Sequence, residues 1–148
     1  LTEAVFEFEG TVDKFIGDEI MAFFGAPIAQ EDHAERAVRC AVRMRECLVE
    51  FNASRPGEAE LAMSIGINSG PVIVGDIGSP QRKDYTVIGD TVNTAKRIES
   101  QAAKGGKIVI GPATQELVKD LYGCEALPPM ALKGKLEQLQ LYSVEVSG

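Results

Sequence analysis

The sequence predicts an α+β fold in which antiparallel strands are mixed with helices. Segments with helical and with strand-like patterns follow one another along the 148 residues, and some neighbouring strands are separated only by tight turns. The hydrophobic fraction of 45% and the charged fraction of 25% are those of an ordinary globular protein. A chain of about 150 residues favours one domain, so we expect a single domain over residues 1–148.

The first elements predicted are the end of a helix and a β-hairpin. The helix covers residues 2–9, and the two strands of the hairpin cover residues 11–16 and 19–24. Gly17-Asp18 supplies the turn between these strands, because glycine allows the backbone to reverse within two residues.

The strongest helical pattern covers residues 31–51. Apolar residues recur there at intervals of three and four, with charged residues on the opposite side. Arg36, Arg39 and Arg43 on that side are open to interpretation as a basic patch. We favour a solvated helix face, which is the usual role of such residues.

The remaining chain continues the mixture of strands and helices. Asp90 or Thr91 is the candidate N-cap of the first helix in this part, and Pro112 suits the first turn of the second. No internal repeat, low-complexity tract or linker interrupts it. Strands are predicted at residues 61–68, 72–75, 85–88, 107–110 and 138–146, and helices at residues 90–103 and 112–121.

Charge, cysteines and hydropathy narrow the functional classes. The net charge of −7 argues against a nucleic acid or an anionic membrane as partner, and no apolar run approaches the ~20 residues of a membrane span. Cys40, Cys47 and Cys124 lack metal-site spacing, so we expect reduced cysteines and a cytoplasmic location, with membrane attachment of the parent protein left open. His33 is the only histidine and is expected on the surface, which argues against histidine-based metal or triad chemistry.

Three segments carry polar side chains where the local pattern favours apolar ones. They are the first hairpin, the strand and helix over residues 85–97, and the basic segment over residues 132–135. Each residue alone suits a turn or a solvated face, but together they suit a phosphate-rich nucleotide held through Mg²⁺. No P-loop, Rossmann, GxSxG or HExxH motif competes with this interpretation. The candidate site residues are Lys14, Asp18, Thr86, Asn93, Arg97 and Lys133.

The order of these motifs resembles the catalytic domain of class III nucleotide cyclases. Within that family the chain is most similar to bacterial-type adenylate cyclases related to the bicarbonate-responsive soluble enzymes. The resemblance implies a ferredoxin-like domain with an antiparallel-rich central sheet flanked by helices. The matching segments cover nearly the whole chain and are Lys14-Phe15-Ile16-Gly17-Asp18, Phe24-Gly25-Ala26-Pro27, Gly66-Ile67-Asn68-Ser69-Gly70-Pro71, Tyr85 to Arg97 and Leu132-Lys133-Gly134-Lys135.

The resemblance assigns chemical roles to four of the candidates. Asp18 matches the second of two aspartates that hold a pair of Mg²⁺ or Mn²⁺ ions, and Lys133 matches the lysine that binds the β- and γ-phosphates. Asn93 matches the residue that positions the ribose, and Arg97 matches the residue that stabilises the transition state at the α-phosphate. These roles imply attack of the ribose 3′-oxygen on the α-phosphate with release of pyrophosphate.

Lys14 and Thr86 match the pair of residues that reads the purine base. Lys14 can only donate a hydrogen bond, which suits N1 of adenine and opposes N1–H of guanine. Thr86 can accept from the adenine amine, but its hydroxyl can also donate to guanine. We therefore expect ATP as substrate and cyclic AMP as product, with guanylate cyclase activity as the alternative.

The resemblance also implies a head-to-tail homodimer, with Asp18 from one subunit and the other five candidates from its partner. The family's first metal-binding aspartate lies on a strand that would precede Leu1. We therefore expect a domain truncated at its N-terminus, inactive or weakly active alone, and a parent protein with an upstream regulatory domain. A degenerate domain that only binds nucleotide or dimerises is the alternative, and a diguanylate cyclase is disfavoured because no Gly-Gly-Asp-Glu turn is present.

Overall fold

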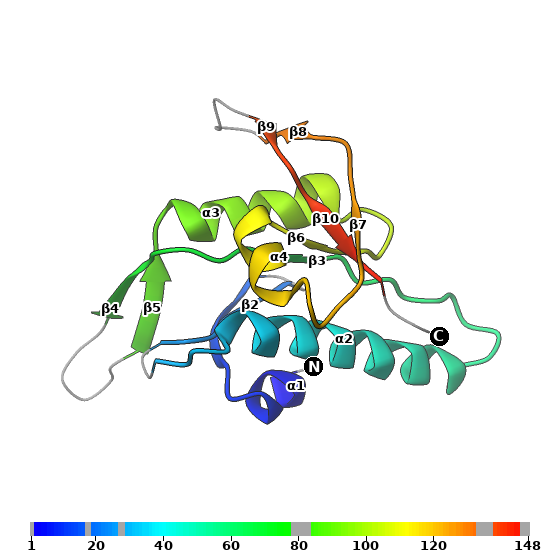
Figure 1. Cartoon of the computed structure of the whole chain (residues 1–148). Coiled ribbons are helices and arrows are strands. Elements are labelled where there is room, and N and C mark those ends of the chain that lie inside the picture. The colour runs from blue at the N-terminus through cyan, green and yellow to red at the C-terminus, as the bar shows by residue number, and fades with distance from the viewer. Residues whose placement is uncertain (1, 17–18, 27–28, 78–83, 133–137, 146–148) are drawn as a thin grey trace.

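The computed structural model describes residues 2–16, 19–26, 29–77, 84–132 and 138–145 (Figure 1). The helices are α1 (Thr2–Glu7), α2 (His33–Ala53), α3 (Asp90–Arg97), the π-helical turn η1 (Ile98–Ala102) and α4 (Pro112–Val118). The strands are β1 (Thr11–Ile16), β2 (Glu19–Phe23), β3 (Ile65–Ile67), β4 (Ile73–Ile77), β5 (Asp84–Ile88), β6 (Ile108–Ile110), β7 (Cys124–Ala126), β8 (Met130–Ala131), β9 (Gln138–Leu139) and β10 (Tyr142–Val144).

The described strands form one four-stranded sheet and three two-stranded hairpins. The four-stranded sheet has the order β3-β6-β10-β7, and the hairpins are β1-β2, β4-β5 and β8-β9. The β3–β6 pair is parallel, and every other described pair is antiparallel. This arrangement confirms the predicted α+β class and its antiparallel-rich strands. Among the described strands β2 pairs only with β1, and β3 pairs only with β6.

The four-stranded sheet is covered on both faces by helices. In Figure 1, α2 runs along one side of β3 and β6, and α3 with η1 runs along the other. Successive side chains of a strand point to opposite faces of the sheet. Because both faces are covered here, β6 is apolar throughout. Ile108 and Ile110 pack with residues of α2 and α4, whereas Val109 packs with Ile98 of η1. The sheet therefore has an apolar layer on each side of β6, and a third buried cluster, formed by Ala4, Val5 and Cys40, joins α1 to α2.

Helix α2 has the amphipathic character predicted from its sequence. Its buried face carries Ala34, Val38, Cys40 and Ala41. The arginines on its other side form ion pairs, with Arg36 2.8 Å from Asp32, Arg39 2.6 Å from Glu35 and Arg43 3.2 Å from Glu46. Arg39 and Arg43 are partly exposed, which agrees with the solvated helix face that we favoured, whereas Arg36 is more buried and donates to the carbonyl oxygen of Phe8 after α1. The first residue of the helix, His33, is half-buried rather than fully on the surface.

Helix α3 lies close to strand β3 because β3 carries a glycine at the contact. A Cβ atom on Gly66 would lie 2.5 Å from the backbone nitrogen of Glu99 and 2.8 Å from the carbonyl oxygen of Ala95. Real Cβ contacts are essentially never that short, so no larger residue fits without a shift of the helix backbone. Gly66 thereby sets the distance between the four-stranded sheet and the helix that carries Asn93 and Arg97.

Several predicted elements differ from the observed ones in extent. The helix predicted over residues 90–103 divides into α3 and η1, and the strand predicted over residues 138–146 divides into β9 and β10. Strands β7 and β8 were not predicted, because two or three residues are too few to show an alternating pattern. Strands β3 and β4, which flank the Ser69-Gly70-Pro71 connection, belong to different sheets and do not pair.

Candidate active site

The base-reading candidates lie on two strands that contact each other. Lys14 is in β1, opposite Met21 of β2, and its side chain is 45% exposed. Its Nζ lies 3.9 Å from Oδ2 of Asp13, a separation at the outer limit of an ion pair. Thr86 is in the centre of β5, opposite Gly75 of β4. Because β1 contacts β5, the fold brings the two strands of the predicted base-reading pair together.

Asp13 is a neighbour of the candidate site that the sequence interpretation did not select. The pairing of β1 with β2 shifts by one residue between Val12 and Lys14, so Asp13 forms a β-bulge. Its side chain is only 4% exposed although it carries a carboxylate. A bulge changes the direction of the side chains that follow it, and here the next side chain is that of Lys14. The sequence feature that could have identified Asp13 is a carboxylate within a segment of strand-forming residues.

Asn93 and Arg97 lie on one helix, as predicted. Both belong to α3, four residues apart and hence on the same helical face. Asn93 is exposed and Arg97 is half-buried, whereas Thr94 between them is 3% exposed and faces the interior. Strand β5 contacts α3, so Thr86 and Asn93 lie on neighbouring elements. The structure thus brings together the elements that carry four of the six candidates.

The start of α3 differs from the predicted cap. The N-cap residue is Gly89, and no side chain makes a capping hydrogen bond there. Asp90 and Thr91 are already within the helix, so the prediction that one of them is the N-cap was wrong. The Thr91 hydroxyl instead donates a hydrogen bond of 2.8 Å to the carbonyl oxygen of Pro71. Asn68 Nδ2 donates to the carbonyl oxygen of Thr91 at 3.1 Å.

Two predicted site residues, Asp18 and Lys133, lie outside the described residues. In the sequence, Asp18 lies between Ile16 and Glu19, which pair across β1 and β2, and Lys133 directly follows the buried Leu132. Within the ranges that the structure describes, no three acidic, histidine or cysteine side chains form a group able to hold a metal ion.

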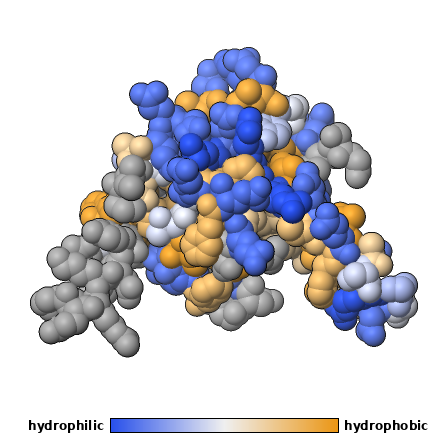
Figure 2. All heavy atoms as spheres, turned by 90° about the horizontal axis from the view of Figure 1, so that it is seen from below, coloured by the Kyte–Doolittle hydropathy of each residue, from blue (hydrophilic) through white to orange (hydrophobic). Residues whose placement is uncertain are grey.

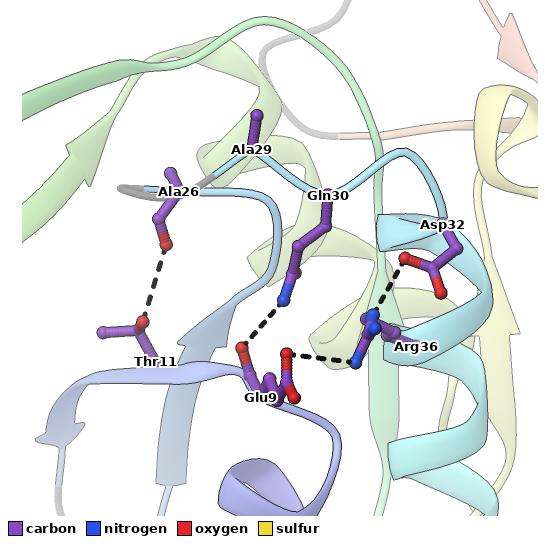
Figure 3. A pocket seen from close by; sticks show the side chains of 7 residues that line it. All are labelled: Glu9, Thr11, Ala26, Ala29, Gln30, Asp32 and Arg36. Carbon is purple, nitrogen blue, oxygen red and sulfur yellow. Dashed lines mark hydrogen bonds and ion pairs between the residues drawn. The ribbon is translucent and has the colours of Figure 1, made fainter.

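A pocket of about 310 Å³ lies away from these candidates, where the β2–α2 connection meets the end of α1 (Figure 3). Its polar groups bind one another. The guanidinium of Arg36 bonds to Asp32 at 2.8 Å and lies 3.6 Å from Glu9, and Gln30 donates to the carbonyl oxygen of Glu9 at 3.1 Å. The Arg36 hydrogen bond lowers the pKa of the Asp32 carboxyl. These polar groups therefore connect the end of α1 to the start of α2.

The cysteines are free, as predicted. Burial raises the pKa of the Cys40 thiol to about 11 and also raises the pKa of the Cys124 thiol. Since the thiolate is the reactive form, neither shift favours nucleophilic chemistry.

Comparison with known proteins agrees with the geometry. Residues 9–145 match the family described as the adenylate and guanylate cyclase catalytic domain. The chain is 36% identical over 146 residues to adenylate cyclase 1 of Rhizobium meliloti (strain 1021), covering 97% of this chain and 22% of that protein. It therefore spans well under half the length of the curated relatives that it matches first.

Solved structures of both kinds of cyclase share the fold. The adenylyl cyclase CyaB from P. aeruginosa superimposes with a TM-score of 0.82 and 34% identity, over 99% of this chain and 77% of that one. The guanylate cyclase domain of RhGC from Catenaria anguillulae, solved in complex with GTP, superimposes with a TM-score of 0.86 and 34% identity, over 99% and 78%.

The fold and the order of the site elements define a nucleotide cyclase domain. This chain belongs to the class III nucleotide cyclase family, whose members make cyclic nucleotides and use divalent metal ions. Among the helices of the described residues, none is long and apolar enough to cross a membrane.

Proposed function

We propose that this domain is the catalytic domain of an adenylate cyclase, which converts ATP to 3′,5′-cyclic AMP and pyrophosphate. The observation that carries the choice of ATP is Lys14, an exposed side chain on the strand next to the one that carries Thr86. An ammonium group donates hydrogen bonds and cannot accept them, so it matches N1 of adenine and opposes N1–H of guanine. The similarity to adenylate cyclase 1 of Rhizobium meliloti supports the same choice.

The proposed chemistry depends on positioning and on charge. The ribose 3′-oxygen attacks the α-phosphorus, a new O–P bond forms, and the bond to the pyrophosphate oxygen breaks. Asn93 orients the ribose, and the planar guanidinium of Arg97 donates to the phosphate oxygens where negative charge develops. Lys133 binds the β- and γ-phosphates. Divalent ions, two in each site and held partly by Asp18, would supply further positive charge at the phosphates.

The proposed active form is a head-to-tail homodimer in which Asp18 of one subunit faces the other five site residues of its partner. Large apolar side chains on β1, β4 and β5 support an interface there. Phe15 is 63% exposed, Ile73 is 70% exposed and Ile88 is 56% exposed. Figure 2 shows a mainly hydrophilic face with separate apolar patches, one of them on the left, the side on which β4 and β5 lie in Figure 1.

Mixing two inactive variants tests this assembly. An Asp18→Ala chain and an Asn93→Ala chain should each be inactive, whereas their mixture should recover one intact site in each heterodimer. Recovered cyclic AMP production is the measurement. A mixture that stays inactive, although both variants fold and dimerise, would contradict sites shared between subunits.

We also propose that the first metal-binding aspartate and a regulatory domain lie upstream in the parent protein. The open edges of β2 and β3 among the described strands are consistent with an added strand. The deciding experiment measures cyclic nucleotide production from ATP and from GTP with Mn²⁺, on this chain and on a chain extended upstream. Activity of the extended chain with ATP preferred supports the proposal. A preference for GTP assigns a guanylate cyclase, and nucleotide binding without turnover in either chain assigns a degenerate domain.

A further inference from the structure

The connection between β3 and β4 is bonded to the first turn of α3 by two side chains. Asn68, just after β3, donates from Nδ2 to the carbonyl oxygen of Thr91 at 3.1 Å. Thr91 returns a hydrogen bond from Oγ1 to the carbonyl oxygen of Pro71 at 2.8 Å. Thr91 is therefore held by one bond that it accepts and one that it donates, both with a segment about 20 residues earlier in the chain.

Asn68 is itself held from its other side by the start of α4. A Cβ atom on Gly111, the N-cap residue of α4, would lie 2.5 Å from Oδ1 of Asn68. Gly111 has an ordinary extended backbone with φ of −77°, so it is space and not backbone conformation that calls for glycine here. The Gly111 nitrogen donates to the carbonyl oxygen of Ile67 at 3.0 Å. The amide of Asn68 thus fills the space between the start of α4 and the start of α3.

The neighbouring residue extends the same connection to α4. Ser69 Oγ lies 2.7 Å from Oγ1 of Thr114, a hydroxyl whose residue is fully buried. Residues 68–71 are therefore hydrogen-bonded to both α3 and α4, which hold the connection from two sides. Because this connection is held in place, its hydrogen bonds to Thr91 also hold the first turn of α3 in place.

The bonds from residues 68–71 support the first turn of α3, which has no side-chain cap. It has eight residues, and its N-cap Gly89 makes no side-chain capping bond. Helices that short are marginal without tertiary contacts. Asn93 and Arg97 follow Thr91 within the next two turns of the helix. Any tilt of the first turn would therefore move both side chains.

We propose that Asn68, acting through Thr91, is a positioning residue that fixes the orientation of α3 and thereby places Asn93 and Arg97 for catalysis. This inference rests on the proposed function, in which these two side chains act at the ribose and the α-phosphate. Lys14 and Thr86, the proposed base-reading pair, lie on β1 and β5 and not on α3. Loss of the Asn68 bond should therefore reduce turnover more than it reduces ATP binding.

The first test compares two asparagines with similar bonds in the full-length protein. Asn68→Ala should lower kcat about 10- to 100-fold with KM little changed, because a misplacement near 1 Å has effects of that size. Asn52→Ala is the matched control, since Asn52 makes two backbone hydrogen bonds to Leu61, at 2.9 and 3.0 Å, at the far end of α2. It should keep the parental kcat. Equal kcat losses in both variants, or none in Asn68→Ala, would overturn the proposal.

Asn68→Asp, which keeps the size of the side chain but lacks the amide donor, covers the case in which Asn68→Ala does not fold, and it should lower turnover likewise. A second pair of variants tests the other bond of this connection, from the Thr91 hydroxyl to the carbonyl oxygen of Pro71. Thr91→Ser keeps the hydroxyl that donates to Pro71, whereas Thr91→Val removes it with little change in shape. Thr91→Ser should retain turnover and Thr91→Val should lose it. Equal turnover in the two variants would contradict a role for this bond.

A double variant tests whether Gly111 acts through Asn68. Gly111→Ala should lower kcat because the added methyl group displaces the Asn68 amide. In the Asn68→Ala background that amide is absent, so Gly111→Ala should add little further loss. If the two losses in kcat simply multiply, Gly111 acts independently of Asn68, which would contradict the proposed contact between them.

Amide hydrogen exchange separates failure of this inference from failure of the proposed function. Asn68→Ala should speed exchange over residues 89–97 and leave α2 unchanged, whether or not the protein makes cyclic AMP. If the parent protein has no cyclase activity, the proposed function fails, and the exchange result alone decides the positioning role. Unchanged exchange over residues 89–97 would overturn the inference even in an active cyclase.

Discussion

At the scale of single residues, removal of the Arg97 guanidinium should affect kcat much more than KM. Arg97 lies half-buried at the end of α3, and in the proposed mechanism its positive charge meets the charge that develops on the α-phosphate. Arg97→Ala should lower kcat roughly 100- to 1,000-fold and change KM much less, because the charge is needed mainly in the transition state. Steady-state kinetics with ATP and Mn²⁺ measures both constants.

The control for this substitution is another arginine of similar chemistry. Arg39→Ala removes a half-exposed guanidinium of α2 that pairs with Glu35, and it should leave kcat unchanged. A rise in KM with unchanged kcat for Arg97→Ala would contradict the proposed role, since it would indicate equal binding of ground state and transition state.

Cys40 gives a prediction for stability at high pH. The pKa of its buried thiol rises from 9.0 to about 11 in the folded protein, so the unfolded chain releases this proton first as pH rises. The free energy of unfolding should therefore be insensitive to this group below about pH 8 and should fall between pH 9 and 11, by roughly 2 kcal/mol. Cys40→Ala should remove that part of the slope, as urea unfolding from pH 7 to 11 would show.

The methyl-for-thiol change leaves a small cavity, which should affect stability equally at every pH. The comparison of slopes therefore isolates the thiol. Val42→Ala, on the same helix and without a titratable group, is the control and should keep the parental slope. A parental slope in Cys40→Ala as well would refute the assignment.

At the scale of elements, sequence patterns predicted what depends on local periodicity. Helix α2 and the β1–β2 hairpin were predicted because a long amphipathic repeat and a Gly-Asp turn are local signals. The bulge at Asp13 and the anchoring by Asn68 were not predicted. The Asn68 bond joins residues 23 positions apart, and only the folded chain brings them together. The same holds for Thr91, whose type suggested an N-cap although its hydroxyl bonds to Pro71.

The contact between β3 and α3 gives a prediction at this scale. Gly66→Ala would place a methyl group 2.5 and 2.8 Å from two backbone atoms of the helix, which cannot rotate away. The helix must move, so we expect a loss of about 1–3 kcal/mol in the free energy of unfolding together with lower turnover. Gly75→Ala in β4 is the control, because a Cβ there meets nothing within 4 Å. Equal stability of the two variants in urea unfolding would refute the close contact.

At the scale of the whole molecule, the proposed site is divided between two subunits, and the structure describes four of its six residues. The described residues of a single chain bring β1, β5 and α3 together, and with them Lys14, Thr86, Asn93 and Arg97. Among those described residues, no three acidic, histidine or cysteine side chains gather in one group able to hold a metal ion. The motif order could be recognised from the sequence, but the division of the site between subunits follows from resemblance and stays a prediction.

The exposed apolar side chains on β1, β4 and β5 allow a test of whether the site is shared between two subunits. Ile73, 70% exposed in β4, should be buried in the dimer, so Ile73→Asp should weaken self-association at least about tenfold. Val49→Asp is the matched control, since Val49 is 58% exposed on α2 and lies outside the proposed interface. Sedimentation velocity over a concentration series measures the dissociation constant of each variant.

Activity should follow association by mass action if each site needs two subunits. Ile73→Asp should then be poorly active in dilute solution and should recover specific activity as protein concentration rises, because a higher concentration restores the dimer. Val49→Asp should show parental activity throughout. Full activity of monomeric Ile73→Asp would mean that one chain holds a complete site. The acidic residues that complete it would then have to come from the same chain as Asn93 and Arg97.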